Sequence, residues 1–240
     1  MIAALYSSVD SSNSVDGRDG AVLSASFILS CGRYDSAMTY SSGKVAGALI
    51  FIAGTQKVLG VIVAEALYPG YSVSNNYLSD LGVGPSPMIF NSSAFLMGLL
   101  LLIGACFLHR AFNFTMLTLT FVLAGIGSMG VGIFTKDAGI IHNGAALLFF
   151  LFSGLSAIFA VVCSHVHGFK LMKMPFSAIS IILGLIELGG FVLFVGRIDF
   201  GLGVGGMQRM VLYPILMWLA GFGGYLIAYP EERRTQQKPQ

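Results

Sequence analysis

Apolar residues along this chain of 240 residues are gathered into six long runs, and short polar segments separate one run from the next. Each run is about 20 residues long, which is enough for an α-helix to cross about 30 Å of hydrocarbon. A transmembrane β-barrel would instead show short segments of alternating apolar and polar residues. The pattern therefore predicts an all-α fold, a polytopic bundle of six transmembrane helices, with spans near residues 45–67, 87–108, 116–134, 144–164, 177–195 and 210–228.

Polar segments flank this predicted membrane domain of residues 44–229. Residues 1–43 are rich in serine, and their one apolar run, residues 21–31, is too short to span a bilayer. We expect residues 1–43 to be disordered or to lie on a surface, and residues 230–240 to be a cytoplasmic tail. One hypothesis is that residues 1–37 reflect the choice of start codon, because Met38 stands just before the first span. Sequencing the N-terminus of the native protein tests it.

Basic residues are distributed unevenly between the two sides of the predicted bundle. Of the 13 Lys and Arg residues, three lie on one side, Lys57 lies within a span, and nine lie on the other side. The nine are Arg18, Arg33, Lys44, Arg110, Lys170, Lys173, Arg233, Arg234 and Lys238. Since cytoplasmic loops carry the excess of Lys and Arg, we expect both termini to be cytoplasmic.

The amino-acid composition is that of a membrane protein, and it limits the classes of partner that we expect. The chain is 55% hydrophobic and 10% charged, whereas soluble domains are about 25% charged. A net charge of +2 is too small to indicate a nucleic-acid partner. We expect the lipid bilayer of the cell membrane as the main partner, with a lipid or another membrane protein as a further one. The three cysteines show no metal-ligand spacing, so we expect no metal site and no cofactor.

The polar segment of residues 65–93 joins the first two spans and contains no Lys or Arg. Its Tyr, Asn, Ser, Asp, Gly and Pro residues form turns at defined positions, whereas a solvated linker favours Lys and Glu. We expect residues 71–85 to form an ordered cap over the outer end of the bundle. Asp80 should be inside this cap and bonded to Arg197, Arg209, Lys136 or backbone amides, because a buried carboxylate must be paired.

Two interpretations of this polar cluster are open. Its side chains either satisfy one another as a folded lid, which balanced charge favours, or form an outward-facing site. For the second interpretation, the candidates for acid, base or nucleophile are Ser79, Asp80 and His142. The cluster as a whole comprises Asn75, Asn76, Tyr77, Asp80, Arg197 and Arg209.

Three charged residues, Lys57, Glu65 and Glu187, are predicted to lie within the membrane. A lone charge at mid-membrane costs about 2.5–3.5 kcal/mol on insertion scales, so each should be paired or neutralised. Lys57 and Glu187 reach similar depths when the rise of an α-helix is counted from the start of each span. They can therefore pair if the first and fifth helices touch. A proton or cation relay through these groups is the alternative.

The segment Gly201–Gly206 reads GLGVGG and matches the G-x-G-x-x-G fingerprint of dinucleotide-binding folds. No strand precedes it and no βαβ unit surrounds it, so the match carries no weight. We expect a flexible hairpin between the last two spans.

Two segments carry a resemblance to a known family. Residues 64–85 read AEALYPGYSVSNNYLSDLGVGP, and residues 89–104 read IFNSSAFLMGLLLLIG. Together with MGVGIF at residues 129–134 and the following His142, they make the chain resemble domain-of-unknown-function family 998, a group of archaeal and bacterial membrane proteins. The likeness covers roughly residues 45–228. It implies a six-helix bundle and an archaeal source, and it supplies no activity.

Three classes of function remain in competition. The first is a non-enzymatic protein that binds or scaffolds a partner through its outer cap. The second is a transporter of a small solute or ion that uses Lys57, Glu65 and Glu187. The third is a membrane hydrolase or lipid-modifying enzyme, which requires Ser79, Asp80 and His142 to converge around a cleft. Whether the outer loops enclose a cavity discriminates among these classes.

Overall fold

The computed structural model describes residues 36–166 and 171–229, and these residues contain six long α-helices and no strand. All six helices are long and apolar enough to cross a membrane, which confirms the predicted all-α, multi-pass fold. Two short 3-10 helices, η1 and η2, lie in the connections. The elements are α2 (Ser36–Ala66), η1 (Leu78–Gly82), α3 (Pro87–Phe112), α4 (Thr115–Ile133), η2 (Lys136–Ala138), α5 (Ile140–Val166), α6 (Phe176–Val195) and α7 (Gly203–Ile227).

Contacts divide the chain into two units, residues 1–38 and residues 39–240. In the first unit only residues 36–38 are described, and they are helical. The rest of the predicted N-terminal extension and the tail of residues 230–240 lie outside the described residues.

The observed helices extend beyond the predicted spans, most of all at the start of α2 and of α7. Hydropathy marks where an apolar run begins, whereas backbone hydrogen bonding continues into polar and glycine-rich flanks. The predicted hairpin at Gly201–Gly206 is therefore wrong in part, since α7 begins at Gly203. Contacts of this first turn with the segment before η1, described below, hold these glycines in a helix.

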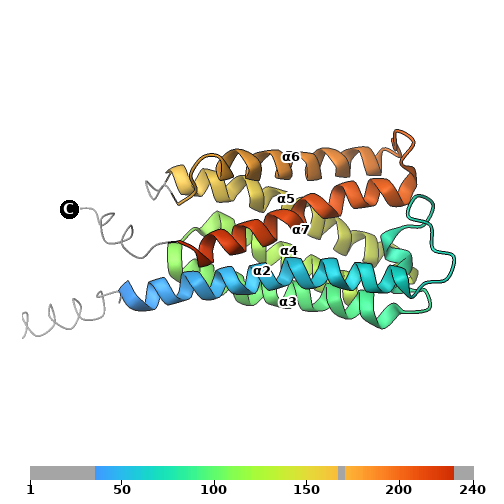
Figure 1. Ribbon diagram of the computed structural model, residues 1–240, viewed down its shortest axis with the longest axis horizontal. Helices are drawn as coiled ribbons and strands as arrows, with labels where there is room; N and C mark the ends of the chain where they lie inside the picture. The colour runs from blue at the N-terminus through green and yellow to red at the C-terminus, as the bar shows by residue number, and fades with distance from the viewer. Residues whose placement is uncertain (1–35, 167–170, 230–240) are drawn as a thin grey trace, which may run out of the picture. The chain divides into compact units, whose positions relative to one another are not determined.

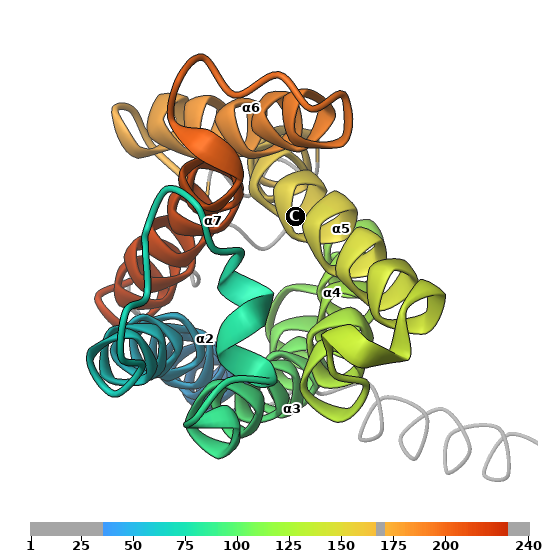
Figure 2. The same ribbon diagram turned by 90° about the vertical axis from the view of Figure 1, so that its right-hand side faces the viewer.

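Neighbouring helices in the sequence are also neighbours in space, from α3 and α4 through to α6 and α7. The ring is closed by the first and last helices, where a Cβ on Gly47 of α2 would lie 2.7 Å from the carbonyl oxygen of Gly223 in α7. Only glycine permits this approach of the two backbones, as in other helix pairs in lipid. Figure 1 shows the helices running side by side, and Figure 2 shows the ring seen from one end.

An aromatic cluster fills the bundle on the side of the chain termini. Trp218 and Phe222 stack with ring centroids 4.9 Å apart, and the ring centroid of Phe121 from α4 lies 5.9 Å from that of Trp218. All three side chains are fully or almost fully buried. The only polar atom of this cluster, the indole nitrogen of Trp218, donates to Ser180 Oγ at 3.0 Å, so the core here is closed and satisfied.

Three connections meet at the opposite end of the ring, which we call the cap end. They are the segment between α2 and α3 with η1, the segment between α4 and α5 with η2, and the turn between α6 and α7. η1 lies within the outline of the ring (Figure 2) and buries Leu78 and Leu81. The cap end is the part of the fold that positions the candidate site.

Candidate functional site

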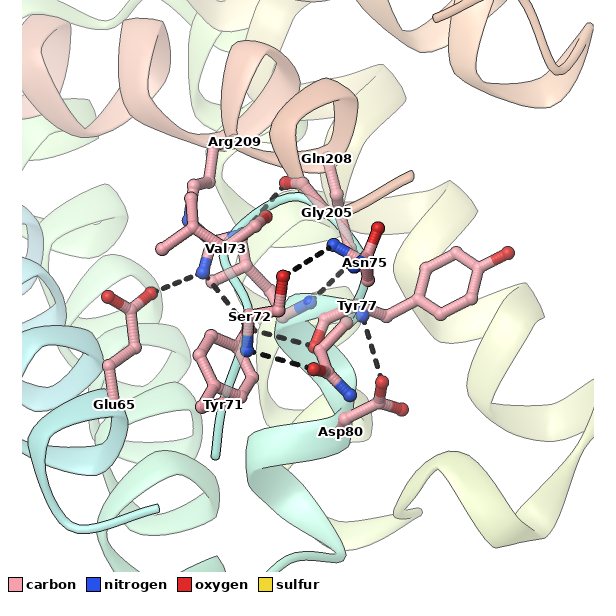
Figure 3. A network of polar contacts seen from close by, with 12 residues as sticks. Glu65, Tyr71, Ser72, Val73, Asn75, Tyr77, Asp80, Gly205, Gln208 and Arg209 are labelled. Carbon is pink, nitrogen blue, oxygen red and sulfur yellow. Dashed lines mark hydrogen bonds and ion pairs between the residues drawn. The ribbon is translucent and has the colours of Figure 1, made fainter. Parts of the chain in front are cut away.

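Arg209, in the second turn of α7, fastens the segment before η1 to the bundle (Figure 3). Its guanidinium donates to the carboxylate of Glu65 at 2.5 Å and to the Tyr71 hydroxyl at 3.0 Å. It also donates to the carbonyl oxygens of Val73 at 2.9 Å and of Gly205 at 2.8 Å. A planar guanidinium with several fixed donors suits such a junction. We call residues 71–77, which precede η1, the cap segment. Arg209 therefore joins the end of α2, the cap segment and the start of α7.

The cap segment then lies directly on the first turn of α7. The amide of Gly205 donates to the carbonyl oxygen of Ser74 at 2.9 Å, and the Ser74 hydroxyl donates to the carbonyl oxygen of Leu202 at 2.9 Å. A Cβ on Gly205 would lie 2.1 Å from the carbonyl oxygen of Asn76. The glycines of the GLGVGG segment thus serve close backbone approach.

Asn75 and Asn76 act within the segment itself. The Asn76 side chain accepts a hydrogen bond from the amide of Ser72 at 2.9 Å, and the Asn75 amide donates to the Ser72 hydroxyl at 3.2 Å. Such local bonds are the ordinary use of Asn and Ser in turns. The Asn76 side chain and the backbone amide of Asn75 thus stabilise this turn.

Asp80, inside η1, fixes one side of a cavity. Its carboxylate accepts the amide of Tyr77 at 2.8 Å and forms an ion pair with Lys136 of η2. The Lys136 ammonium also lies 4.4 Å from the centroid of the Tyr77 ring, which contacts Phe194 of α6 edge to face. The expected partner Lys136 is present, whereas Arg209 binds Glu65 instead, and Arg197 has no ion-pair partner among the described residues.

A cavity of about 750 Å³ opens at the cap end, and we call it the cap cavity. Its walls come from η1, η2, α5, α6, the α6–α7 turn and the start of α7. Apolar side chains dominate the faces of α5 and α6, including Ala146, Leu147, Phe150, Phe191 and Phe194. Its polar lining is formed by Tyr77, Ser79, Lys136, His142, Asn143, Arg197, Asp199 and Gln208. The connections at the cap end and the adjoining helices therefore line one cavity.

A smaller cavity of about 40 Å³ lies beside the cap cavity, and we call it the inner chamber. The two share Ser79, His142, Ala146, Phe150 and Gln208 as lining residues. The inner chamber adds Lys57 from α2, Phe90 and Met97 from α3, and Ser128 from α4. A set of polar side chains thus leads from the cap end into the bundle.

The predicted ion pair between Lys57 and Glu187 is wrong. Lys57 donates to the carbonyl oxygen of Phe90 and to the Ser93 hydroxyl, both at 3.1 Å. Glu187 accepts from the Ser153 hydroxyl at 2.5 Å, and its other oxygen has no hydrogen-bond partner among the described residues. The rise per residue predicts a depth for each charge, but it does not predict the direction in which each helix face points.

The catalytic arrangement required for a hydrolase is not formed by hydrogen bonds among the described residues. Ser79 and His142 line both cavities, yet no hydrogen bond joins them. Nδ1 of His142 lies 2.8 Å from the carbonyl oxygen of Phe134, and since a carbonyl only accepts, this nitrogen carries the proton. Asp80 is engaged by Lys136 and Tyr77, so it does not orient the imidazole.

The structure thus sorts the candidate residues into three groups. Glu65, Arg209, Asn75 and Asn76 hold the cap segment, while Tyr77, Ser79, His142 and Arg197 line the cap cavity. Glu187 lines neither cavity. Sequence reasoning missed the aromatic wall of Phe150, Phe191 and Phe194, because an aromatic residue that faces a cavity looks the same in sequence as one that faces lipid.

Comparison with known proteins confirms the resemblance. The family model described as "Protein of unknown function (DUF998)" matches residues 45–225. No curated protein and no solved structure matches the chain.

Proposed function

The chain belongs to the DUF998 family of proteins of unknown function, and from the geometry of the cap cavity we propose that it is a membrane protein that binds an amphipathic molecule. The observation that carries this proposal is the combination of an apolar aromatic wall and a polar rim in one cavity of about 750 Å³. Ligand sites commonly have volumes of about 300–1,000 Å³, with mostly apolar walls and a few polar groups that orient the ligand.

The lining of the cap cavity contains both apolar and polar side chains, and this mixture favours a ligand with an apolar body. Phe150 of α5 and Phe191 of α6 lie with ring centroids 5.7 Å apart and form part of the apolar wall. η1 and η2 add the hydroxyl of Ser79 and the ammonium of Lys136 to the lining. A wholly polar solute would leave the aromatic wall without apolar contact, and burial of apolar surface contributes about 25 cal/mol per Å².

Entry from the membrane is supported by the exposure of two lining residues. Leu147 of α5 is 49% exposed and Val195 of α6 is 65% exposed, although both line the cap cavity. Both residues belong to helices that are long and apolar enough to cross a membrane. The proposed ligand therefore enters sideways between α5 and α6, as a lipid or another molecule dissolved in the membrane.

Photocrosslinking tests the proposal. The purified protein in nanodiscs is incubated with a long-chain fatty alcohol that carries a diazirine in its tail, and the labelled peptides are identified by mass spectrometry. We expect labels on the cavity faces of α5 and α6. Ala146→Trp, which fills the cavity, should reduce this labelling, whereas Leu185→Trp should not, because Leu185 is 56% exposed and does not line the cavity. Labelling spread evenly over all lipid-facing residues, and unchanged by Ala146→Trp, would contradict the proposal.

The cap end faces away from the cytoplasm in this proposal. The excess of Lys and Arg at the opposite end supports that orientation. In a variant that lacks the native cysteines, Asn75→Cys should react with an impermeant maleimide added to intact cells, and Lys173→Cys should react only after lysis. Both positions are exposed. Reaction of Lys173→Cys in intact cells would reverse the orientation.

Transport is a second candidate, and one observation favours it. The inner chamber reaches Lys57, so polar lining extends from the cap end into the bundle. Transport further requires a second conformation in which the aromatic cluster around Trp218 opens. The chain has one Trp, so its fluorescence should change when a transported solute is added. Unchanged Trp218 emission together with bound ligand would favour binding alone.

A further inference from the structure

We propose that the inner chamber receives the carboxylate of a long-chain amphiphile, with Lys57 as its counter-charge. This inference rests on the proposed function, and it names the chemical class of the ligand and the position of its head group. The apolar tail then lies along the aromatic wall of the cap cavity.

Lys57 is a buried amine without a counter-charge. Its side chain is almost completely enclosed, with the residue 2% exposed. It has no ion-pair partner among the described residues, and its two hydrogen-bond acceptors, the Phe90 carbonyl and the Ser93 hydroxyl, are both neutral. The ring centroid of Phe90, 3.5 Å from the ammonium, contributes further electrostatic attraction but no charge. An amine that is buried in this way is either neutral or paired with an anion, and the carboxylate of a bound ligand would supply that anion.

Of the other cations near the cavities, two are paired, and Arg197 lines only the cap cavity and not the inner chamber. Lys136 is paired with Asp80, and Arg209 is paired with Glu65. None of the described residues that line the inner chamber is Asp or Glu, and Glu187 lies elsewhere, against Gly154 at the contact of α5 and α6. An anion in the chamber would therefore meet Lys57 without a competing carboxylate in the lining.

Neutral hydrogen-bond donors lie where the cap cavity and the inner chamber meet. The amide of Leu78 donates to Oε1 of Gln208 at 2.7 Å, and this bond fixes the orientation of the Gln208 side chain, because only its oxygen can accept. The NH₂ group of Gln208 then has no acceptor among the described residues, and neither has the hydroxyl of Ser79. Both residues line both cavities. They can donate to the second oxygen of a carboxylate that Lys57 holds.

The size of the chamber selects among anionic head groups. A volume of about 40 Å³ accommodates about three water-sized groups, if one such group needs roughly 10–15 Å³. The carbon and two oxygens of a carboxylate match that size. A phosphodiester, which carries four oxygens and a second substituent, exceeds it.

The experiment compares a long-chain fatty acid with the fatty alcohol of the same length, both carrying a diazirine in the tail. We expect the wild-type protein to prefer the acid by about 10-fold or more, since hydrogen bonds to charged groups are worth about 1.5–3 kcal/mol. Lys57→Met should remove this preference and leave labelling by the alcohol unchanged. Because Met replaces a buried charge with an apolar side chain of similar length, the variant should still fold. Arg197→Met is the matched control at the exposed rim.

A second measurement needs no variant. A fatty acid with the diazirine next to its carboxylate should label residues of the inner chamber, such as Met97 and Phe149. Labelling at Arg197 instead, or loss of the acid preference in Arg197→Met but not in Lys57→Met, would place the head group at the rim and overturn the inference. If the alcohol binds and the acid has no advantage, the inference alone fails. If neither molecule labels the cavity, the proposed function fails with it.

Discussion

Removal of the Arg209 side chain should release the cap from the bundle while the six helices remain folded. In Arg209→Met, the carboxylate of Glu65 loses its ion pair, and the cap segment loses its bonds from the guanidinium to Tyr71 and Val73. The helix contacts on the side of the chain termini, around Trp218, do not involve Arg209. The effect should therefore be local.

The magnitude follows from the burial of the pair. The Arg209 side chain is 7% exposed and the Glu65 side chain is 21% exposed. Loss of one partner of a buried ion pair costs about 3–5 kcal/mol, because the remaining charge is left without compensation. Glu65 can regain some water, so we expect the lower end of this range, about 3 kcal/mol. Since about 1.4 kcal/mol corresponds to a factor of ten, the opening equilibrium of the cap should rise on the order of 100-fold.

Hydrogen–deuterium exchange of the purified protein measures this opening directly. Peptides that cover residues 71–82 should exchange faster in Arg209→Met, while peptides from the middle of α4 and α7 should be unchanged. Lys136→Met is the matched control, because the Lys136 side chain is 38% exposed and exposed pairs contribute at most about 1 kcal/mol. The double variant Arg209→Met with Glu65→Gln should recover part of the loss. Equal exchange in both single variants, or faster exchange throughout the bundle, would refute this reasoning.

Three further predictions concern single positions. Gly205→Ala should displace the cap segment and raise its hydrogen–deuterium exchange rate, because the new Cβ would lie 2.1 Å from the carbonyl oxygen of Asn76. Gly224→Ala in the same helix is the control and should be neutral, because its Cβ meets nothing within 4 Å. Glu187→Gln should be at least as heat-stable in detergent as the wild type, because the amide oxygen keeps the bond from the serine hydroxyl and the charge is removed; a clearly lower melting temperature would show that the charge is required. Burial raises the pKa of Tyr71 above its ordinary value of 10.0, although the hydrogen bond from an arginine opposes this. Because the pKa of Tyr71 is raised in the folded state, the contribution of its protonated hydroxyl to cap stability is complete below pH 10 and is lost as the pH rises through the folded pKa. An alkaline titration followed by tyrosinate absorbance should therefore show a late-titrating tyrosine, and Tyr71→Phe should remove it.

The sequence by itself determined the six spans, because a backbone in lipid must satisfy its own hydrogen bonds and long apolar runs permit only helices. It also determined that the polar segment between α2 and α3 is structured, since its Asn, Ser and Gly residues form turns and its lack of Lys and Glu disfavours a solvated linker. These are local properties of the chain, and each depends on residues that are close in sequence.

The tertiary structure alone decided which side chains meet. Arg209 and Glu65 are 144 residues apart. Nothing in the sequence indicates that Arg209 forms an ion pair with Glu65 while Asp80 forms one with Lys136. The direction of a side chain depends on how each helix is rotated in the ring, and small residues such as Gly47 and Gly223 set that rotation through close backbone contact. Lys57 therefore faces the inner chamber and Glu187 faces Ser153. The cap cavity exists because lining residues that are far apart in the sequence, from Tyr77 to Gln208, come together around one space at the cap end.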